Sequence, residues 1–326
     1  MSKAVKMEDI AKELGISVVS VSKGLAGKEG VSDQMRDRIF ETALRLGYKL
    51  DKDKKKASGN IGVIVADRFM DDNAFYQKLY RQIIIHCTGC GYSGMLEIIS
   101  SSDEKELIIP KVVRDHIVDG VVFMGDVSKE YIERFRKTKL PYILVDFHVE
   151  NIDADCIISD NIYGEMRLTE LMIERGRKKI AFVGDVLATT SILDRYLGYT
   201  RALLMNRIMP KEEWLIIDRD EDGRYIELAL PENMPDAFVC NCDEVAFNLV
   251  MKLKQMGYRV PEDISVAGYD DYTFSMLCDP KLTTYKVNTE EMAKKAVEQL
   301  VKRIKGRTVI YGQSVIGGEL IKRDSI

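Results

Sequence analysis

From residue 60 onward, short apolar runs alternate with amphipathic stretches. The runs have the length of strands and are continuously hydrophobic, as expected for strands that are buried on both faces of a sheet. The first set occupies 61–66, 93–98, 120–125, 141–147 and 156–159, and a second set occupies 179–184, 214–217, 237–241 and 264–269. Strands that alternate with helices predict parallel sheets, so the fold class is α/β with two doubly wound lobes.

Helices are expected between these strands. They fall near 74–89, 104–115, 129–137 and 161–175 in the first set and near 191–206, 223–229 and 243–256 in the second. Ligands of such sheets bind outside the carboxyl ends of the strands, in the cleft between two lobes. Polar residues occupy these positions here, among them Asp67, Asp146, Asp185 and Asp270. Residues 61–326 are therefore expected to form a two-lobed body, similar to a periplasmic binding protein, with a ligand site between the lobes.

Residues 5–48 show a different pattern, that of three short helices. Apolar residues recur at helical spacing in each helix. Gly15 is suited to end the first helix, and Ser17 and Ser32 are suited to cap the second and the third. A glycine turn that leads into a capped second helix is typical of a helix-turn-helix, which presents that helix to a DNA groove. Residues 1–48 are therefore expected to be a DNA-binding head.

The charge distribution separates the two parts of the chain. Residues 1–56 contain 13 Lys and Arg against 9 Asp and Glu, a balance of +4, whereas the remaining residues contain 35 against 43, a balance of −8. A basic head suits contact with phosphates. The lysines at 52, 54, 55 and 56 belong to a charged linker, residues 49–60. Taken alone this run fits a solvated linker better than a DNA contact, but together with the capped helices it favours DNA binding.

Several classes of protein are disfavoured. The chain has no apolar run of about 18 residues and no signal-peptide pattern, so we expect a cytoplasmic protein without a membrane partner. Its six cysteines are then expected to be reduced. Cys87 and Cys90 beside His86 could indicate a zinc or redox site, but no second pair lies at ligand spacing, and buried thiols are the expected interpretation. We expect no metal and no cofactor.

Catalytic motifs are also lacking. Residues 89–94 match the glycine pattern of a dinucleotide-binding loop, but they follow a predicted helix and enter a strand, which is the reverse of the required order. No phosphate-binding loop, nucleophile elbow or HExxH motif occurs. The three histidines, His86, His116 and His148, occupy no evident cleft position. The sequence predicts no catalytic residue and no enzyme.

These segments together resemble the lactose repressor (LacI/GalR) family of bacterial transcriptional regulators over essentially the whole chain. The matching pieces include, in order, DIAKELGIS, SVSKGLAGKEGVS, NIGVIVAD, VDGVVFMG, ISDNIYG, RKKIAFVGD, CDEVAF, VPEDISVAGYDD and KLTTYKV. The resemblance implies a homodimer that binds a near-palindromic operator in double-stranded DNA. It also implies that a small-molecule effector in the cleft controls the head, and that the protein catalyses no reaction.

The resemblance places DNA contacts on six residues of the second helix and its cap: Ser17, Val18, Val19, Ser20, Ser22 and Lys23. Val18, Val19 and Lys23 stand where the family reads base edges, and the serines stand where it contacts phosphates. Valine methyls can touch thymine methyls, and a lysine can reach guanine O6 and N7. The alternative for the valines is a plain helix surface.

The resemblance also places effector contacts on six residues of the body: Phe75, Tyr76, Asp160, Arg195, Asp243 and Asp270. An arginine and a carboxylate in an aromatic-lined cleft suit a sugar or a nucleoside-like molecule. Asp160 and Asp243 are equally suited to cap the helices that begin just after them. Arg219 and Asp220 fall near a position that is often aromatic in the family, which suggests a more polar effector.

The linker departs from the family pattern. After the Gly47-Tyr48 pair the family usually has a proline, an alanine-rich hinge helix and a leucine that enters the minor groove. Residues 49–60 instead alternate in charge and contain no proline. Such a run offers little apolar surface for a helix pair, so wedging into the groove and strong bending of the operator are not expected.

The sequence thus predicts an effector-controlled DNA-binding regulator, most simply a repressor of a carbohydrate-utilisation operon. The alternative is a solute-binding receptor without a DNA-binding role. That alternative explains the two lobes equally well but leaves the head unexplained. A sugar-modifying enzyme is a third hypothesis, which lacks an activated nucleophile or a metal set.

Overall fold

The computed structural model describes residues 5–25, 30–46, 59–70, 74–220, 223–307 and 311–326. The chain divides into two compact units, Met1–Lys56 and Ala57–Ile326, which we call the head and the body. The predicted linker, residues 49–60, lies outside the described residues except for Gly59 and Asn60. The hinge behaviour expected of it therefore stays a prediction.

The head contains three helices, α1 (Met7–Leu14), α2 (Val18–Leu25) and α3 (Asp33–Leu46). Its core is small and includes Ile10, Val21 and Ile39. Gly24 is buried where α2 meets α3, and a β-carbon at this position would lie 2.6 Å from Cδ1 of Ile39. A glycine weakens an isolated helix by about 1 kcal/mol relative to alanine. At this position it permits the close packing of the two helices.

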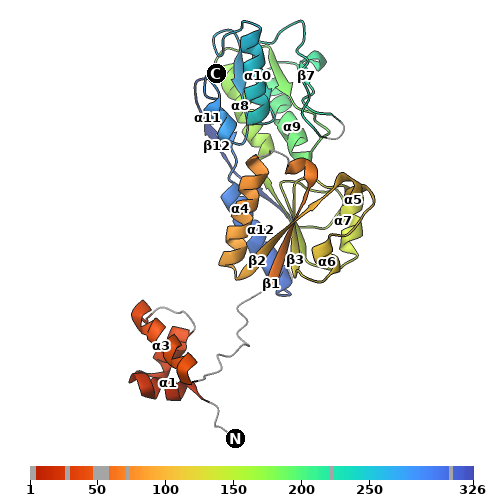
Figure 1. The fold of residues 1–326 in the computed structure, drawn as a ribbon. Helices are drawn as coiled ribbons and strands as arrows, with labels where there is room; N and C mark the ends of the chain where they lie inside the picture. The colour runs from red at the N-terminus through yellow and green to blue at the C-terminus, as the bar shows by residue number, and fades with distance from the viewer. Residues whose placement is uncertain (1–4, 26–29, 47–58, 71–73, 221–222, 308–310) are drawn as a thin grey trace. The chain divides into compact units, whose positions relative to one another are not determined.

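The first lobe of the body has a six-stranded parallel sheet. In spatial order its strands are β11 (Gln313–Ile316), β5 (Cys156–Ser159), β4 (Tyr142–Val145), β3 (Gly120–Met124), β1 (Gly59–Ala66) and β2 (Tyr92–Ile99). Two long helices cover one face of the sheet, α4 (Ala74–Gly89) and α12 (Thr289–Ile304). Three short helices cover the other face (Figure 1): α5 (Ser101–Lys105), α6 (Lys111–Arg114) and α7 (Lys129–Arg136).

The second lobe has a four-stranded parallel sheet. In spatial order its strands are β7 (Leu215–Ile216), β6 (Ile180–Val183), β8 (Ala237–Cys240) and β9 (Ser265–Ala267). Its longer helices are α8 (Asn161–Glu174), α9 (Thr190–Met205) and α10 (Asp243–Gln255), and a short one is α11 (Thr273–Leu277). The predicted fold class, a helix-turn-helix head and two doubly wound lobes, is confirmed.

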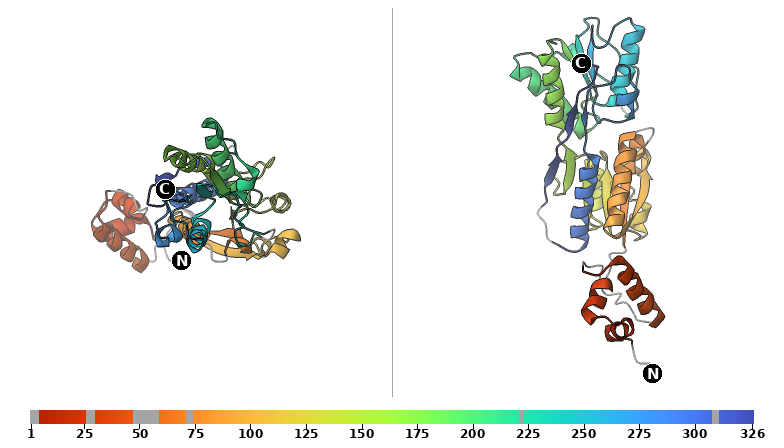
Figure 2. Two further views of the ribbon diagram at one scale, coloured as in Figure 1. Left: turned by 90° about the horizontal axis from the view of Figure 1, so that it is seen from above. Right: turned by 90° about the vertical axis from the view of Figure 1, so that its left-hand side faces the viewer.

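The chain passes between the lobes three times, a feature that we did not predict from the sequence. The first passage joins β5 to α8, and the second joins β10 (Thr284–Lys286) to α12. The third joins β11 to β12 (Glu319–Ile321), which pairs with β10 in an antiparallel sheet. Figure 2 shows the result in its right-hand view, where α12 (blue) lies beside α4 (orange). Each lobe is therefore completed by residues from the end of the body.

Two predicted helices were wrong in detail. Pro110 divides the helix expected at 104–115 and precedes α6, because proline has no N–H for an interior helix bond. The helix expected at 223–229 does not form. Arg219 instead pairs with Tyr225 in an antiparallel bridge, and both side chains line a cavity of the body. This bridge and the contacts of its side chains outweigh the local helical pattern.

Gly198 provides a test of the packing between α8 and α9. A β-carbon at this position would lie 2.3 Å from the carbonyl oxygen of Ile162. Gly198→Ala must separate the two helices, so we expect a loss of about 1–3 kcal/mol in the free energy of unfolding of the body. Gly89→Ala is the matched control, because Gly89 ends α4 with nothing within 4 Å of such a β-carbon. Equal midpoints in calorimetry for the two variants would contradict this packing argument.

Candidate functional site

The beginning of α2 is the candidate DNA-contacting surface of the head. Gly15 ends α1 in the left-handed conformation, with φ of 64°, and the chain then turns into Ser17. The Ser17 hydroxyl accepts a hydrogen bond from the Ser20 N–H at 3.0 Å, as an N-cap does. Val18 and Val19 are 40% and 65% exposed, although valine is usually buried.

All six residues predicted to contact DNA lie on α2 or its cap, and each is at least partly exposed: Ser17, Val18, Val19, Ser20, Ser22 and Lys23. Their surface combines two small apolar side chains, three hydroxyls and one ammonium group. These groups match methyl contacts in a groove, hydrogen bonds to phosphate, and one cationic contact to a base or phosphate.

Four of the six predicted effector residues line one cavity between the lobes: Phe75, Tyr76, Arg195 and Asp270. The aromatic pair comes from α4 of the first lobe, and the charged pair comes from α9 and from the end of β9 in the second. The volume of this inner cavity is about 50 Å³, room for a few water-sized groups. It shares Phe69, Thr189, Arg219 and Tyr225 with an outer compartment of about 480 Å³.

Arg195 is held by several partners at the inner cavity. Its Nε donates to Oδ1 of Asn161 at 3.0 Å, and Nη1 donates to the carbonyl oxygen of Asn241. Nη2 lies 3.5 Å from Oδ1 of Asp270, and the guanidinium lies 4.0 Å from the centroid of the Tyr269 ring. The side chain is 5% exposed. Its position is therefore set by protein contacts on several sides.

Arg219 is committed to protein partners in the same way. Its Nε and Nη2 donate to the two carboxylate oxygens of Asp218 at 3.1 and 2.8 Å, and Nη2 also donates to Oδ1 of Asn241 at 3.1 Å. The guanidinium lies 5.1 Å from the centroid of Tyr225. Both arginines that line the cavity are thus paired with carboxylates of the second lobe.

Two carboxyl groups of the first lobe face this region. Asp146 follows β4 and accepts a hydrogen bond from the Tyr76 hydroxyl at 2.9 Å through Oδ2. Its Oδ1 has no hydrogen-bond partner within the described part of the chain. Asp126 follows β3 and accepts a hydrogen bond from the Thr190 N–H at 2.6 Å, at the beginning of α9. This last bond links the two lobes directly.

Burial raises the pKa of these carboxyl groups. It raises the pKa of Asp126 to about 7, and the pKa values of Asp146 and Asp270 to about 6. Arg195 acts in the opposite direction on both Asp146 and Asp270. Glu165 of α8 is fully buried, and burial holds its pKa well above the usual range. The carboxyl groups of this region therefore ionise at higher pH than exposed carboxyl groups do.

Asp160 and Asp243 do not line the cavity. Asp160 caps α8, where its Oδ1 accepts a hydrogen bond from the Tyr163 N–H at 3.3 Å. Asp243 is buried and accepts hydrogen bonds from the Thr284 hydroxyl at 2.7 Å and the Tyr272 N–H at 3.0 Å. These positions favour structural roles, although for Asp243 the role is a tertiary link and not the cap of α10.

Sequence reasoning missed other residues of this region. Asp126 also follows a strand, so the rule that noted Asp270 would have found it. Asn241 was noted by that rule but was not assigned to the site. Asp146 was noted for its position after a strand but was not assigned to the site. Tyr225 was hidden because residues 223–229 were expected to be a helix. Phe69 and Tyr272 carried no signal, since a single aromatic residue in a loop has many roles.

The cysteine cluster does not resemble a reactive site. Cys87 is buried near the end of α4, and burial raises the pKa of its thiol to about 12, so it carries little thiolate. Within the described ranges, no group of three or more His, Cys, Asp or Glu residues could hold a metal ion. No helix in the same ranges is both long enough and apolar enough to cross a membrane.

Comparison with known proteins covers the whole chain. A family model described as a periplasmic binding protein-like domain matches residues 169–326. The HTH-type transcriptional regulator RegA of Clostridium saccharobutylicum is 27% identical, with 99% of each chain covered. The HTH-type transcriptional repressor PurR of Vibrio atlanticus is 28% identical, with 98% of each chain covered. Together these matches support the resemblance of the chain to the lactose repressor (LacI/GalR) family.

Two solved structures share the LacI/GalR fold with this chain. A complex of the transcriptional regulator CelR with cellobiose has a TM-score of 0.73 at 21% identity, over 98% of this chain and 99% of that one. The Lac repressor dimer bound to operator and the anti-inducer ONPF has a TM-score of 0.68 at 21% identity, over 99% of each chain. At these identities the likeness extends to the fold.

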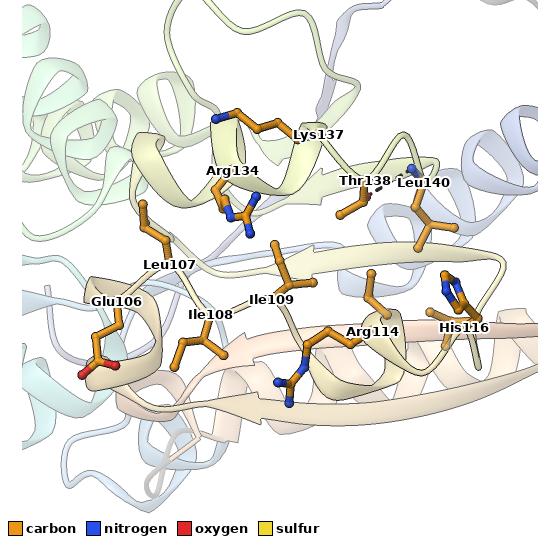
Figure 3. A pocket seen from close by; sticks show the side chains of 12 residues that line it. Glu106, Leu107, Ile108, Ile109, Arg114, His116, Arg134, Lys137, Thr138 and Leu140 are labelled. Atoms are coloured by element: carbon orange, nitrogen blue, oxygen red, sulfur yellow. Dashed lines mark hydrogen bonds between the residues drawn. The ribbon is translucent and has the colours of Figure 1, made fainter.

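The body also has a groove of about 780 Å³, on the face of the first lobe that carries α6 and α7 (Figure 3). Its floor includes the buried side chains of Ile109 and Val113, and Arg114 and Arg134 lie on its exposed rim. None of the six predicted effector residues lines it. Despite its size, it is not the site that the sequence predicts.

The raised pKa of Asp126 leads to a prediction about pH. Burial raises the pKa of this carboxyl to about 7, and the neighbouring Asp146 also raises it. The hydrogen bond from the Thr190 N–H and the charge of Arg68 lower the pKa. As the pH falls through about 7, Asp126 takes up a proton in the folded body but stays ionised in the unfolded chain. Proton binding by the folded state alone stabilises that state. We expect the unfolding midpoint of the body to rise by a few degrees from about pH 7.5 to about pH 5.5.

Asp126→Asn keeps an oxygen that can accept from Thr190 but removes the titration. The rise in midpoint should therefore be smaller in this variant. A control is Glu130→Gln, which changes an exposed carboxyl of α7 and should leave the rise intact. An unchanged pH profile in Asp126→Asn would show that this carboxyl does not contribute.

Proposed function

We propose that this transcriptional regulator is a repressor and that a small polar effector, bound between the two lobes, controls its binding to an operator. The observation that carries the proposal is the meeting of Phe75 and Tyr76 of the first lobe with Arg195 and Asp270 of the second. The body can populate conformations that differ in how the two lobes are arranged. A ligand shifts the population between such conformations only if it binds one of them more tightly. A site shared between lobes meets that condition.

The effector that we assign is a sugar or a nucleoside-like molecule. The CelR structure contains cellobiose. A ribose operon repressor of Haemophilus influenzae is 25% identical over 98% of each chain. In the present chain, aromatic rings and paired polar groups surround the cavity, and Ser100, Ser101 and Ser102 line its outer compartment. Such a lining suits a ring with several hydroxyls.

The regulator acts as a homodimer on a near-palindromic operator in double-stranded DNA. Two-fold symmetry places one head on each half-site. Apolar side chains that are exposed in the single chain are candidates for the contact between copies: Ile85 of α4, Ile98 of β2, and Met276 and Leu277 of α11 are 50%, 48%, 50% and 66% exposed. We assign the protein to the cytoplasm and give it no catalytic step.

The alternative is a solute-binding receptor without a DNA-binding role. The body alone would serve such a receptor. The head argues against it, because an exposed valine pair on a capped helix has no use in a receptor of that kind. The two functions differ in whether the chain selects a DNA sequence at all.

Lys23→Ala tests sequence reading by α2. Loss of a contact to a base edge costs about 1–3 kcal/mol, so affinity for an operator selected from random duplexes should fall by about 5- to 100-fold. Affinity for unselected DNA should fall much less. Lys12→Ala, at an exposed lysine of α1, is the control. Equal losses on both DNAs in a gel-shift titration would refute base contact by Lys23.

Asp270→Asn tests the cavity as the effector site. A thermal-shift screen of sugars and nucleosides should find a compound that raises the unfolding midpoint of the wild-type protein. That compound should change operator binding by the wild type and have at least about 10-fold less effect on Asp270→Asn, since a carboxylate hydrogen bond contributes about 1.5–3 kcal/mol. Operator binding without the compound should persist. An unaltered response would place the effector elsewhere.

A further inference from the structure

The region between the lobes has more carboxyl groups than free cations. Asp146 and Asp270 line the inner cavity, and Asp126 lies at the lobe contact. The two arginines of the lining are already engaged, Arg195 with Asp270 and Arg219 with Asp218. In the inner cavity, a phosphate or carboxylate ligand would therefore meet only guanidinium groups that already have carboxylate partners, and it would face the like charges of Asp146 and Asp270. The outer compartment differs, because exposed Arg224 lines it.

Two carboxylate oxygens, one from each lobe, are buried at the inner cavity without a hydrogen bond. Oδ1 of Asp146 and Oδ1 of Asp270 have no hydrogen-bond partner in the described part of the chain, and the residues are 3% and 7% exposed. The Asp270 oxygen has Arg195 at 3.5 Å as its ion-pair partner. A buried carboxylate oxygen that lacks a donor is costly. These two oxygens can therefore accept hydrogen bonds from a ligand, and hydrogen bonds from a positively charged donor are stronger than those from a neutral one.

Both carboxylates sit in strained turns after their strands. Asp146 has φ of 71° and Asp270 has φ of 100°, a region that side-chain-bearing residues rarely adopt. Each such conformation costs of order 1–3 kcal/mol and persists only where the surroundings impose it. Both lobes thus hold an aspartate at the cavity in an unfavourable backbone conformation.

Aromatic rings complete the surroundings. Phe69, Phe75 and Tyr76 form a cluster, with ring centroids 5.0 Å apart for Phe69 and Tyr76 and 5.1 Å apart for Phe75 and Tyr76. Tyr225 and Tyr272 line the same cavity. The faces of such rings attract ammonium groups. Arginines already lie over Phe69 and Tyr225, with Arg68 4.9 Å and Arg219 5.1 Å from the ring centroids. The cavity therefore combines carboxylates with aromatic side chains, a lining that suits a cationic head group.

The two compartments differ in size in a way that suits such a ligand. The inner cavity, about 50 Å³, holds an ammonium group but not a sugar ring. The outer compartment, about 480 Å³, is in the range of small-molecule sites and carries the hydroxyls of Ser100, Ser101, Ser102 and Thr189.

From this geometry we infer that the effector is a hydroxylated amine, such as an amino sugar, whose protonated amino group enters the inner cavity against Asp146 and Asp270. Its hydroxylated body occupies the outer compartment. The inference rests on the proposed function, because it concerns the same site and narrows the class of effector. Burial raises the pKa of both aspartates only to about 6, so both are mainly ionised at neutral pH.

The test compares matched pairs of compounds that differ in one group. Thermal shifts of the full-length protein are measured near neutral pH with D-glucosamine and D-glucose, D-galactosamine and D-galactose, D-mannosamine and D-mannose, and with N-acetyl-D-glucosamine as an uncharged amide. We expect at least one amine to raise the unfolding midpoint and to bind about 10- to 100-fold more tightly than its hydroxyl partner, the range of a charged hydrogen bond. The amide should behave as the neutral sugars do.

Two variants locate the effect. Asp146→Asn should abolish the preference for the amine, whereas Glu130→Gln, at an exposed carboxyl of the same lobe, should retain it. Neutral sugars that raise the midpoint more than their amines would overturn the inference and leave the proposed function standing. A panel without any shift would also overturn it, and the operator-binding experiment with Lys23→Ala would then judge the proposed function separately. The comparison of pairs uses the wild-type protein, so it holds even if Asp146→Asn folds poorly.

Discussion

The second lobe depends on one buried guanidinium. Arg195 joins the beginning of α8 through Asn161, the end of β8 through Asn241 and the end of β9 through Asp270. A buried charge without partners costs several kcal/mol, so these element ends are positioned together or not at all. The cavity inherits this constraint, because two of its lining residues are partners of the same arginine. What a ligand meets there is therefore largely preformed.

Much of this arrangement was predictable from the sequence, and the reasons for the failures are physical. Apolar runs such as 61–66 and 237–241 mark strands because both faces of a parallel sheet are buried, and the residue after a strand marks the ligand edge. Phe75, Tyr76, Arg195 and Asp270 were found through family resemblance and that rule, and they share one cavity. The three passages between lobes were missed, since no local pattern tells which sheet a strand such as β11 will join. Asp160 and Asp243 match both a cap and a ligand contact in sequence, and only the tertiary structure separates the two.

The lobes are held together by different kinds of interaction. One connection between the lobes consists of the three passages of the chain, together with the hydrogen-bonded pair of β10 and β12. The contact between Thr190 and Asp126 is polar and local: the Thr190 N–H donates to the carboxylate at 2.6 Å and the hydroxyl donates to it at 3.3 Å. The passages and the β10–β12 pair cannot separate unless strands unfold. The hydrogen bonds between Thr190 and Asp126 can be replaced by hydrogen bonds to water. Relative movement of the lobes thus has a permanent hinge and a contact that opens at low cost.

The passages between the lobes also set an order for events during synthesis. The core of the head is made of residues up to 46, so it is complete early in translation. The first lobe needs α12 and β11, and the second needs Ser325, whose hydroxyl donates to the Val266 carbonyl and accepts from the Thr283 N–H. A growing chain therefore acquires its DNA-facing helices before either lobe is finished. In a nascent chain the head can therefore be folded before the effector site of the body exists.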